Sequence, residues 1–351
     1  MASAAIAVSV SVRSLRPQDF EQWDEFVFAH PHGSPFHLTA WKKTIEESFG
    51  YRPVYLAATE GPRICGVLPL FYVRNPVIGK ALISSPFAVY GGILAESPEV
   101  ARRLYERAQR FGAKLAVDYL ELRNAFPEQC VGEPNVSRYV TFVQDVGPDE
   151  EAFLAGLPKK TRNVVRKSLK QRFHMEYGVK DPANFDRVHS RNMRRLGTPC
   201  FPRRYLERLL ANFGKMVDIR EVHLGDEVVA VSLNFLFRGE MHTYHAAADT
   251  RYNALAPNTF QYYDHLCWAG RNGYKLFDFG RSKRDTGPFE FKKHWNTLMR
   301  ELPYEIVLIR RKELPNFSPA NPRFRLAIRA WSLLPLPVTR VASRFVLRLF
   351  P

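Results

Sequence analysis

The chain has 351 residues, 46% of them hydrophobic, and carries 51 Lys and Arg against 35 Asp and Glu, which gives a net charge of +16. The length predicts two domains, and the apolar fraction allows each of them to bury a core. The four cysteines are far apart and form no Cys-x-x-Cys pair, which argues against a zinc knuckle, a thioredoxin-type site and a disulfide framework.

The first fifteen residues, MASAAIAVSVSVRSL, lack the early Lys or Arg and the long Leu-rich core of a signal peptide. The alternation of Val8, Val10 and Val12 predicts a first strand instead. No apolar run reaches the roughly 18 to 20 residues that would span a bilayer. We therefore expect a cytoplasmic protein without a transmembrane segment.

The predicted elements follow the same order in both halves of the chain. The first half gives a strand, two helices, a β-hairpin, a strand, a helix and a strand, over 6–12, 17–30, 40–51, 53–60 with 64–73, 90–94, 98–112 and 115–123. The second half gives three helices, a hairpin, a strand, a helix and a strand, over 150–171, 184–196, 203–213, 217–224 with 228–237, 241–249, 258–272 and 275–280. This repeated order predicts two α/β units.

Two segments carry most of the excess charge. Residues 159–172 contain seven Lys or Arg and no acid, and residues 321–351 contain six Arg and no acid. On a helix, four of the first group line one face as a cationic ridge: Lys159, Arg162, Arg166 and Lys170. The ridge predicts a ligand that bears phosphate, such as a tRNA, a CoA, a carrier-protein arm or a nucleotide-linked lipid, and the alternative is a solvated helix face.

The strand over 241–249 carries His242, Tyr244 and His245. Because side chains alternate along a strand, the odd spacing predicts that the two imidazoles lie on opposite faces, which argues against a shared metal ion. We expect no metal site. One histidine and Tyr244 can face a groove, and the alternative is an ordinary hydrogen-bonded strand histidine.

The loop between this strand and the next helix contains Arg251 but no glycine between Met241 and Trp268. A glycine-rich loop at a helix N-terminus would let backbone N–H groups close on a pyrophosphate. The sequence argues against such a tight cradle. An anion held by Arg251 and the helix N-terminus, and a plain capped loop, both fit the loop sequence.

The stretch FDFGRSKRDTGPFEFKKHW, residues 277–295, mixes cations with aromatics after a buried strand. Asp278 ends that strand, where ligand groups commonly lie in α/β sheets, and it is our candidate for accepting or orienting a proton; its alternative role is a salt bridge to Arg281 or Lys283. We expect a loop that is anchored by Phe289 and Phe291 and folds over the site. Its candidate phosphate ligands are Arg281, Lys283, Lys292 and Lys293.

Five stretches, spread in order over the chain, resemble the FemAB-like branch of the GNAT-fold acyltransferases, and most of all the FemAB-type proteins that accompany exosortase/PEP-CTERM and exopolysaccharide systems in Gram-negative bacteria. These stretches are SPFHLTAWKKTIEESFGYRP, LPKKTRNVVRKSLK, LGTPCFPRRYLERLL, FDFGRSKRDTGPFEFKKHW with the following LPYE, and NPRFRLAIRAWSLLPLPV. The resemblance implies an α/β (α+β) fold of two tandem GNAT-like domains with mixed, largely antiparallel sheets. It divides the chain into a first domain (1–147), a second FemAB-like acetyltransferase domain (148–300), a strand returning towards the first domain (301–315) and a basic amphipathic tail (316–351).

The resemblance also implies an acyltransferase that moves an acyl, acetyl or aminoacyl group to an amine of a cell-envelope or exopolysaccharide precursor. The co-substrate would be acyl-CoA or aminoacyl-tRNA, with no tightly bound cofactor, and the acceptor a sugar or peptide amine. Such a reaction needs a proton acceptor, for which Asp278 is the first candidate and Tyr263 and His245 are reserves, and oxyanion donors, for which backbone N–H groups of 244–247 are candidates. The rival from another class is a non-catalytic module that binds anionic polysaccharide or nucleic acid through the same basic groove.

The tail has a helical period of its own. Arg340, Arg344 and Arg348 recur every four residues, beside an apolar stripe formed by Val338, Val341, Phe345 and Leu349. A basic amphipathic helix of this kind suits the surface of an anionic membrane, so the protein is predicted to be peripheral at the inner membrane. The alternative is that the tail docks on the protein's own domains.

Overall fold

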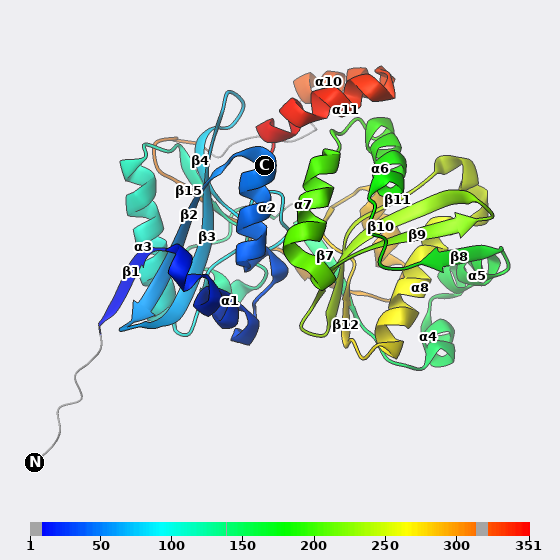
Figure 1. Cartoon of the computed structure of the whole chain (residues 1–351), viewed down its shortest axis with the longest axis horizontal. Helices are drawn as coiled ribbons and strands as arrows, with labels where there is room; N and C mark the ends of the chain where they lie inside the picture. The colour runs from blue at the N-terminus through cyan, green and yellow to red at the C-terminus, as the bar shows by residue number, and fades with distance from the viewer. Residues whose placement is uncertain (1–8, 138, 314–321) are drawn as a thin grey trace, which may run out of the picture. The chain divides into compact units, whose positions relative to one another are not determined.

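The computed structural model describes residues 9–137, 139–313 and 322–351 and contains two compact units (Figure 1). The first unit comprises Met1–Ser137, Leu302–Pro315 and the terminal Pro351, and the second comprises Arg138–Glu301 and Asn316–Phe350. Each contains one mixed sheet, so the predicted fold class of two α/β units is confirmed. The first residues of the predicted strand over 6–12, and the predicted boundary at 315, lie outside the described residues.

The first unit is a seven-stranded sheet with helices on both faces. Its strands are β1 Val10–Ser14, β2 Arg52–Glu60, β3 Arg63–Asn75, β4 Gly79–Ser84, β5 Leu94–Ala95, β6 Tyr119–Leu122 and β15 Glu305–Leu308, and its helices are α1 Phe20–Ala29, α2 Thr39–Phe49 and α3 Pro98–Lys114. The strand order is β1-β2-β3-β4-β6-β15, with β5 beside β3, and only the β4–β6 pairing is parallel. Figure 1 shows α3 on one face of this sheet and α1 and α2 on the other.

Helix α3 shows how sequence sets this packing. Ser97 accepts a hydrogen bond from the backbone N–H of Val100, and Pro98 occupies the first turn, so the helix start is capped as its sequence predicts. Val100, Leu104 and Ala108 follow at a spacing of four and are buried against the sheet. The last strand of this unit, β15, lies in the chain between the two segments of the second unit and pairs antiparallel with β6.

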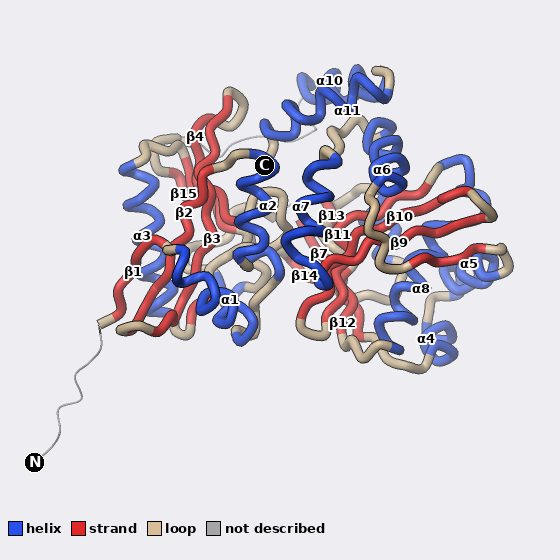
Figure 2. The backbone as a smooth tube through the Cα atoms, viewed as in Figure 1, coloured by secondary structure: helices blue, strands red, loops and turns tan. Residues whose placement is uncertain are grey.

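The second unit is an eight-stranded sheet (Figure 2). Its strands are β7 Tyr139–Asp145, β8 Phe173–Glu176, β9 Val217–Leu224, β10 Glu227–Phe237, β11 Glu240–Ala248, β12 Leu276–Asp278, β13 Ser282–Lys283 and β14 Leu298–Glu301. Its helices are α4 Glu150–Gly156, α5 Lys159–Leu169, α6 Ala183–Arg195, α7 Arg203–Phe213, α8 Pro257–Arg271, α9 Gly287–Lys293, α10 Pro322–Leu333 and α11 Leu336–Val346. The order is β13-β7-β12-β11-β10-β9-β8, with β14 beside β7.

Two sequence predictions need correction here. The helix predicted over 150–171 is two helices, because Pro158 cannot donate a backbone hydrogen bond and forces the preceding residue out of helical geometry. The segment after β12, predicted as a loop, contains β13 and α9. Phe289 does anchor it, with its ring edge-on to Phe142 at 5.3 Å between centroids, but from helix α9 rather than from a loop.

The core below this segment is aromatic. Phe277 of β12 and Phe279 just after it are fully buried, Tyr262 of α8 stacks on Phe279, and Trp295 belongs to the same cluster. Helix α8 therefore covers one face of the sheet, while α6 packs on β10 and β11 over the other face (Figure 1). The face of the sheet under α8 is packed with aromatic side chains, and the candidate site lies on the other face, towards α6.

A close backbone contact gives a stability test. A methyl group at Gly270 of α8 would lie 2.0 Å from the carbonyl oxygen of Gly147, whereas one at Gly156 of α4 would meet nothing within 4 Å. We expect Gly270→Ala to lower the free energy of unfolding by about 1 to 3 kcal/mol, since backbone must move to make room. Gly156→Ala, the matched control, should leave it unchanged or raise it. Urea unfolding at 25 °C decides, and equal stability of the two variants would contradict the packing described.

Candidate active site in the second unit

The site lies where the parallel strands β11 and β12 part. They pair over only three residues, the last pair being His242 with Asp278, after which β12 ends and β11 continues to Ala248. Side-chain and backbone groups at the carboxyl ends of adjacent strands in α/β sheets commonly bind ligands. The sequence prediction that Asp278 ends a strand at such a position agrees with this geometry.

A β-bulge in β11 changes which side chains share a face. His242 pairs with Phe235, Thr243 with Asn234 and His245 with Leu233, so Tyr244 is the extra residue. Because Phe235 and Leu233 lie two apart on β10, their partners His242 and His245 point to the same side of the sheet. The prediction that the two imidazoles lie on opposite faces is therefore wrong, since it assumed regular alternation.

Asp278 is buried at the junction of three strands. Its Oδ1 accepts hydrogen bonds from Thr141 Oγ1 at 2.6 Å and from the backbone N–H of Gly280 at 2.8 Å. Its Oδ2 lies 3.1 Å from Nδ1 of His242. A carboxylate only accepts, so Nδ1 of His242 carries the hydrogen and Nε2 is the basic nitrogen of the ring. Asp278 thus orients an imidazole, which is the arrangement that activates a histidine as a general base.

The turn after β12 is held against β11. Gly280 has φ of 76°, and a Cβ there would lie 2.6 Å from the carbonyl oxygen of Thr243, so only glycine fits without strain. Lys292 of α9 is buried and donates to the carbonyl oxygens of Gly280 at 2.8 Å and Arg281 at 3.4 Å. Burial lowers the pKa of Lys292 to about 7, with the charge of Asp278 acting the other way. Lys292 therefore fixes the turn.

Imidazoles and phenols continue along the same face, towards α6 and α7. The ring of His245 lies 4.1 Å from that of Tyr244 and 5.1 Å from that of His189, centroid to centroid. The hydroxyls of Tyr205 and Tyr244 are 3.2 Å apart. Burial, and then the neighbouring charges of His189 and His242, hold the pKa of His245 well below its usual range, so this imidazole stays neutral at pH 7.

The structure brings some sequence-predicted residues together and separates others. Asp278, Tyr244, His245 and Lys292 meet at the β11–β12 junction. Tyr263 belongs to α8 and lies in its apolar cluster, where its ring stacks on that of Phe153 at 6.0 Å between centroids and burial raises the pKa of its hydroxyl. Tyr263 therefore does not lie at the β11–β12 junction.

The predicted cations also occupy different places. The Arg281 guanidinium lies 4.8 Å from the Tyr139 ring centroid, Lys283 is half-buried on β13, and Lys293 lies 6.0 Å from the Phe289 ring. On α5, Thr161, Val165 and Ser168 face inward, which leaves the ridge on the outer side. The ridge residues Lys159, Arg166 and Lys170 are exposed, and half-buried Arg162 donates to the carbonyl oxygen of Ala155.

Arg251 borders a basic pocket beyond the end of β11. The pocket has a volume of about 530 Å³, and Arg251 itself bonds Asp249 at 2.8 Å. Its wall includes Arg191, Arg194, Arg195, Asp249, Arg251 and Leu336. Four guanidinium groups against one carboxylate make it suited to an anion.

Sequence reasoning missed His242 and Thr141 as functional candidates. Of the two histidines on this strand, the sequence analysis named only His245 as a reserve proton acceptor. Thr141 belongs to β7, a strand that the hydrophobic pattern did not predict. A separate group of potential metal ligands, Glu176, Glu221 and His223, lies on β8 and β9, with His223 Nε2 3.1 Å and 3.4 Å from the two carboxylates. These two strands are not the ones that form the β11–β12 junction.

Comparisons with known proteins identify the domain that contains this junction. Residues 159–293, which include β11, β12 and α8, match the profile of the acetyltransferase (GNAT) domain. No curated protein matches the chain. The fold is similar to FemX, with a TM-score of 0.68, 14% identity and coverage of 86% of this chain and 98% of that one.

Two further solved structures share the fold. L-PGS from Bacillus licheniformis gives a TM-score of 0.56 at 12% identity and covers 92% of this chain and 99% of that one. A tandem GNAT protein from the clavulanic acid biosynthesis pathway gives 0.53 at 9% identity and covers 87% and 100%. Identities this low show fold alone. The second unit therefore contains a GNAT acetyltransferase domain, and the chain as a whole has a tandem GNAT-like fold.

Proposed function

We propose that this protein is a FemAB-type acyltransferase that moves an acyl, acetyl or aminoacyl group from a phosphate-bearing donor to an amine of a cell-envelope or exopolysaccharide precursor. The domain match over 159–293 supports acyl transfer. The FemAB type, and the PEP-CTERM or exopolysaccharide setting, rest on the sequence resemblance. The observation that carries the proposal is the Asp278–His242 pair at the point where β11 and β12 part.

The reaction is direct attack of a neutral amine on an ester or thioester carbonyl. His242 Nε2 takes the proton that the nitrogen loses as the new C–N bond forms, and Asp278 stabilises the imidazolium. Backbone N–H groups of 244–247 are the proposed donors to the oxyanion, because β11 continues there past the end of β12. The intermediate collapses with cleavage of the C–S or C–O bond, and the leaving thiolate or alkoxide takes the proton back from His242.

The basic surfaces suit both donors under consideration. GNAT domains in general use acyl-CoA, and an aminoacyl-tRNA would add a longer phosphate backbone to neutralise. The pocket beside Arg251 and the α5 ridge are the proposed phosphate contacts. The acceptor is a sugar or peptide amine, and the proposal includes peripheral association with an anionic membrane through the tail.

The catalytic pair can be tested once a donor is found. Purified protein is incubated with radiolabelled acyl-CoA or aminoacyl-tRNA and a panel of amino sugars and peptides, and a new covalent product is sought. We expect His242→Gln and Asp278→Asn to lower kcat by about 10² to 10⁴, the usual size of a lost general base, with KM nearly unchanged. His294→Gln, an exposed histidine on the same unit, is the matched control and should retain full activity.

Two results would count against the proposal. Full activity of His242→Gln, corrected for the folded fraction, would remove the general base. Tight, salt-sensitive binding of tRNA or an anionic polysaccharide without any product would support the rival, a non-catalytic binding module.

Lys292 gives a pH test of the buried turn. Its pKa is about 7 in the folded chain and near 10.4 when unfolded, so between these values the unfolded chain binds more protons. Stability from this group therefore rises with pH from about 7 upwards. Between pH 7 and 9 we expect the free energy of unfolding of the wild type to gain on the order of 1 to 2 kcal/mol relative to Lys292→Met. Parallel pH profiles for the two proteins would mean that Lys292 is not held in a buried, desolvated position.

A further inference from the structure

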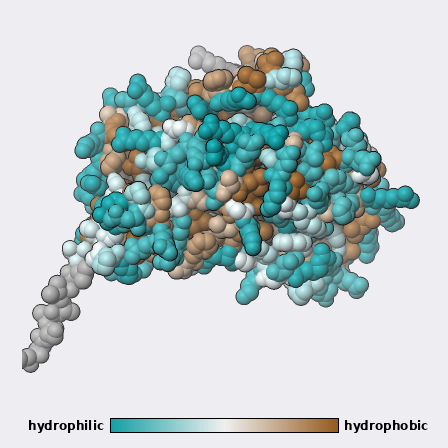
Figure 3. Space-filling view, viewed as in Figure 1, coloured by the Kyte–Doolittle hydropathy of each residue, from teal (hydrophilic) through white to brown (hydrophobic). Residues whose placement is uncertain are grey.

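The two C-terminal helices expose an unusual amount of apolar surface. Among the described residues, seven of the thirteen large hydrophobic side chains that are exposed lie between Leu326 and Phe350. The most exposed are Leu333 at 75%, Leu326 at 71%, Phe345 at 67% and Val341 at 58%. Figure 3 shows hydrophobic surface gathered where Figure 1 places α10 and α11. We call the side chains of Leu326, Leu333, Val338, Val341 and Phe345 the apolar tail face.

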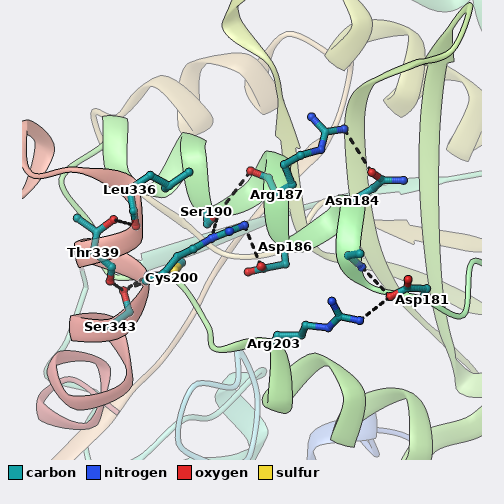
Figure 4. Close-up of polar contacts among 12 residues, drawn as sticks. Asp181, Asn184, Asp186, Arg187, Ser190, Cys200, Arg203, Leu336, Thr339 and Ser343 are labelled. Atoms are coloured by element: carbon teal, nitrogen blue, oxygen red, sulfur yellow. Dashed lines mark hydrogen bonds and ion pairs between the residues drawn. The ribbon is translucent and has the colours of Figure 1, made fainter.

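Helix α11 docks on the second unit through its opposite, small and polar side. Thr339 and Ser343 of α11 are buried, and Ser343 Oγ accepts a hydrogen bond from the backbone N–H of Cys200 at 3.1 Å (Figure 4). Arg340 bonds Asp186 at 2.9 Å and Ser190 at 3.1 Å. A helix that only completes a protein core would turn its apolar stripe inward. Here the hydrogen bonds hold that stripe outward.

Contacts of α10 fix the orientation further. The side chain of Arg194 donates to the carbonyl oxygen of Leu334, and Gly197 lies so close to Ile328 that a Cβ would be 2.4 Å from it. The apolar tail face is therefore presented by a docked element. Exposed patches of this kind mark binding surfaces.

The charges around the apolar tail face identify what it binds. Residues 321–351 contain six Arg and no acid. Arg329 of α10 and Arg344 of α11 are exposed, and so is Arg348, two residues after the end of α11. Arg194 and Arg195 border the basic pocket that Leu336 of α11 also lines. A protein partner would be met by mixed charges, whereas an acid-free cationic rim around Leu, Val and Phe complements lipid phosphates above acyl chains.

We propose that α10 and α11 form a docking surface for anionic phospholipid bilayers, with the apolar tail face entering the interface and Arg329, Arg344 and Arg348 facing headgroup phosphates. No helix among the described residues is long and apolar enough to cross a membrane, so the contact is at one leaflet. This inference rests on the proposed function and adds to it where the acceptor is found: the acceptor amine belongs to a precursor held at the membrane.

The test uses full-length protein and vesicles of phosphatidylcholine alone or with 30% phosphatidylglycerol. We expect co-sedimentation with the anionic vesicles only, and release by high salt. Val341→Ser with Phe345→Ser should weaken vesicle binding about tenfold or more, since both side chains are exposed and their loss removes buried area only in the bound state. Phe28→Ser with Leu298→Ser, exposed elsewhere, is the matched control and should bind as the wild type does.

A second pair of variants separates charge from apolar contact. Arg344→Gln with Arg348→Gln should lower affinity for anionic vesicles and flatten its salt dependence. Equal binding to neutral vesicles, or no binding to either kind at low salt, overturns the inference. So does a wild-type dimer that Val341→Ser with Phe345→Ser dissociates, because a second copy would then cover the face.

Transfer to a soluble amine distinguishes this inference from the proposed function. The apolar variants should keep that activity while losing vesicle binding, since none of their residues touches the β11–β12 junction. Normal transfer with no vesicle binding by the wild type overturns the membrane surface alone. Vesicle binding without any transfer leaves the surface standing and counts against the enzyme.

Discussion

The buried carboxylate of Asp278 is the constraint on which the second unit depends. A buried carboxyl group needs hydrogen-bond partners, and Asp278 finds them in three places: Thr141 of β7, His242 of β11 and the backbone N–H of Gly280. These donors come from residues 141 to 280, so the sheet closes correctly only when all three strands are in register. Asp278 thus both holds the three strands together and takes part in the candidate chemistry.

The same constraint explains the mixture of cations and aromatics after β12. Phe289 and Trp295 point into the core and hold α9 there, which carries Lys292 inward to the carbonyl oxygens of the turn. Lys292 loses water, and its pKa falls as a result. The run that reads as a phosphate-binding loop is therefore in part a structural clamp, and only its outer residues, such as Lys293, are available to a ligand.

The sequence could predict elements whose periodicity is long enough to read. The hairpin of β9 and β10, strand β11 and helix α8 were expected within a residue or two of their bounds, because their apolar spacing persists over eight residues or more. β7 and β14 were not, since what marks them as strands is pairing with residues far away in sequence. The bulge at Tyr244 has no local signal either, and it is what brings His242 and His245 to the same side of the sheet.

Helix α6 contacts both the candidate active site and the helices of the proposed membrane-docking surface. Its buried His189 lies against His245 at the β11–β12 junction, while Asp186 and Ser190 on the same helix hold Arg340 of the tail. A single helix of thirteen residues thus sets the distance and angle between the catalytic pair and the apolar tail face. Both contacts are made within one packed unit, so the distance between a bilayer bound to the tail and the active site would be fixed. An acceptor amine carried on a lipid would have to span that distance to reach the catalytic pair.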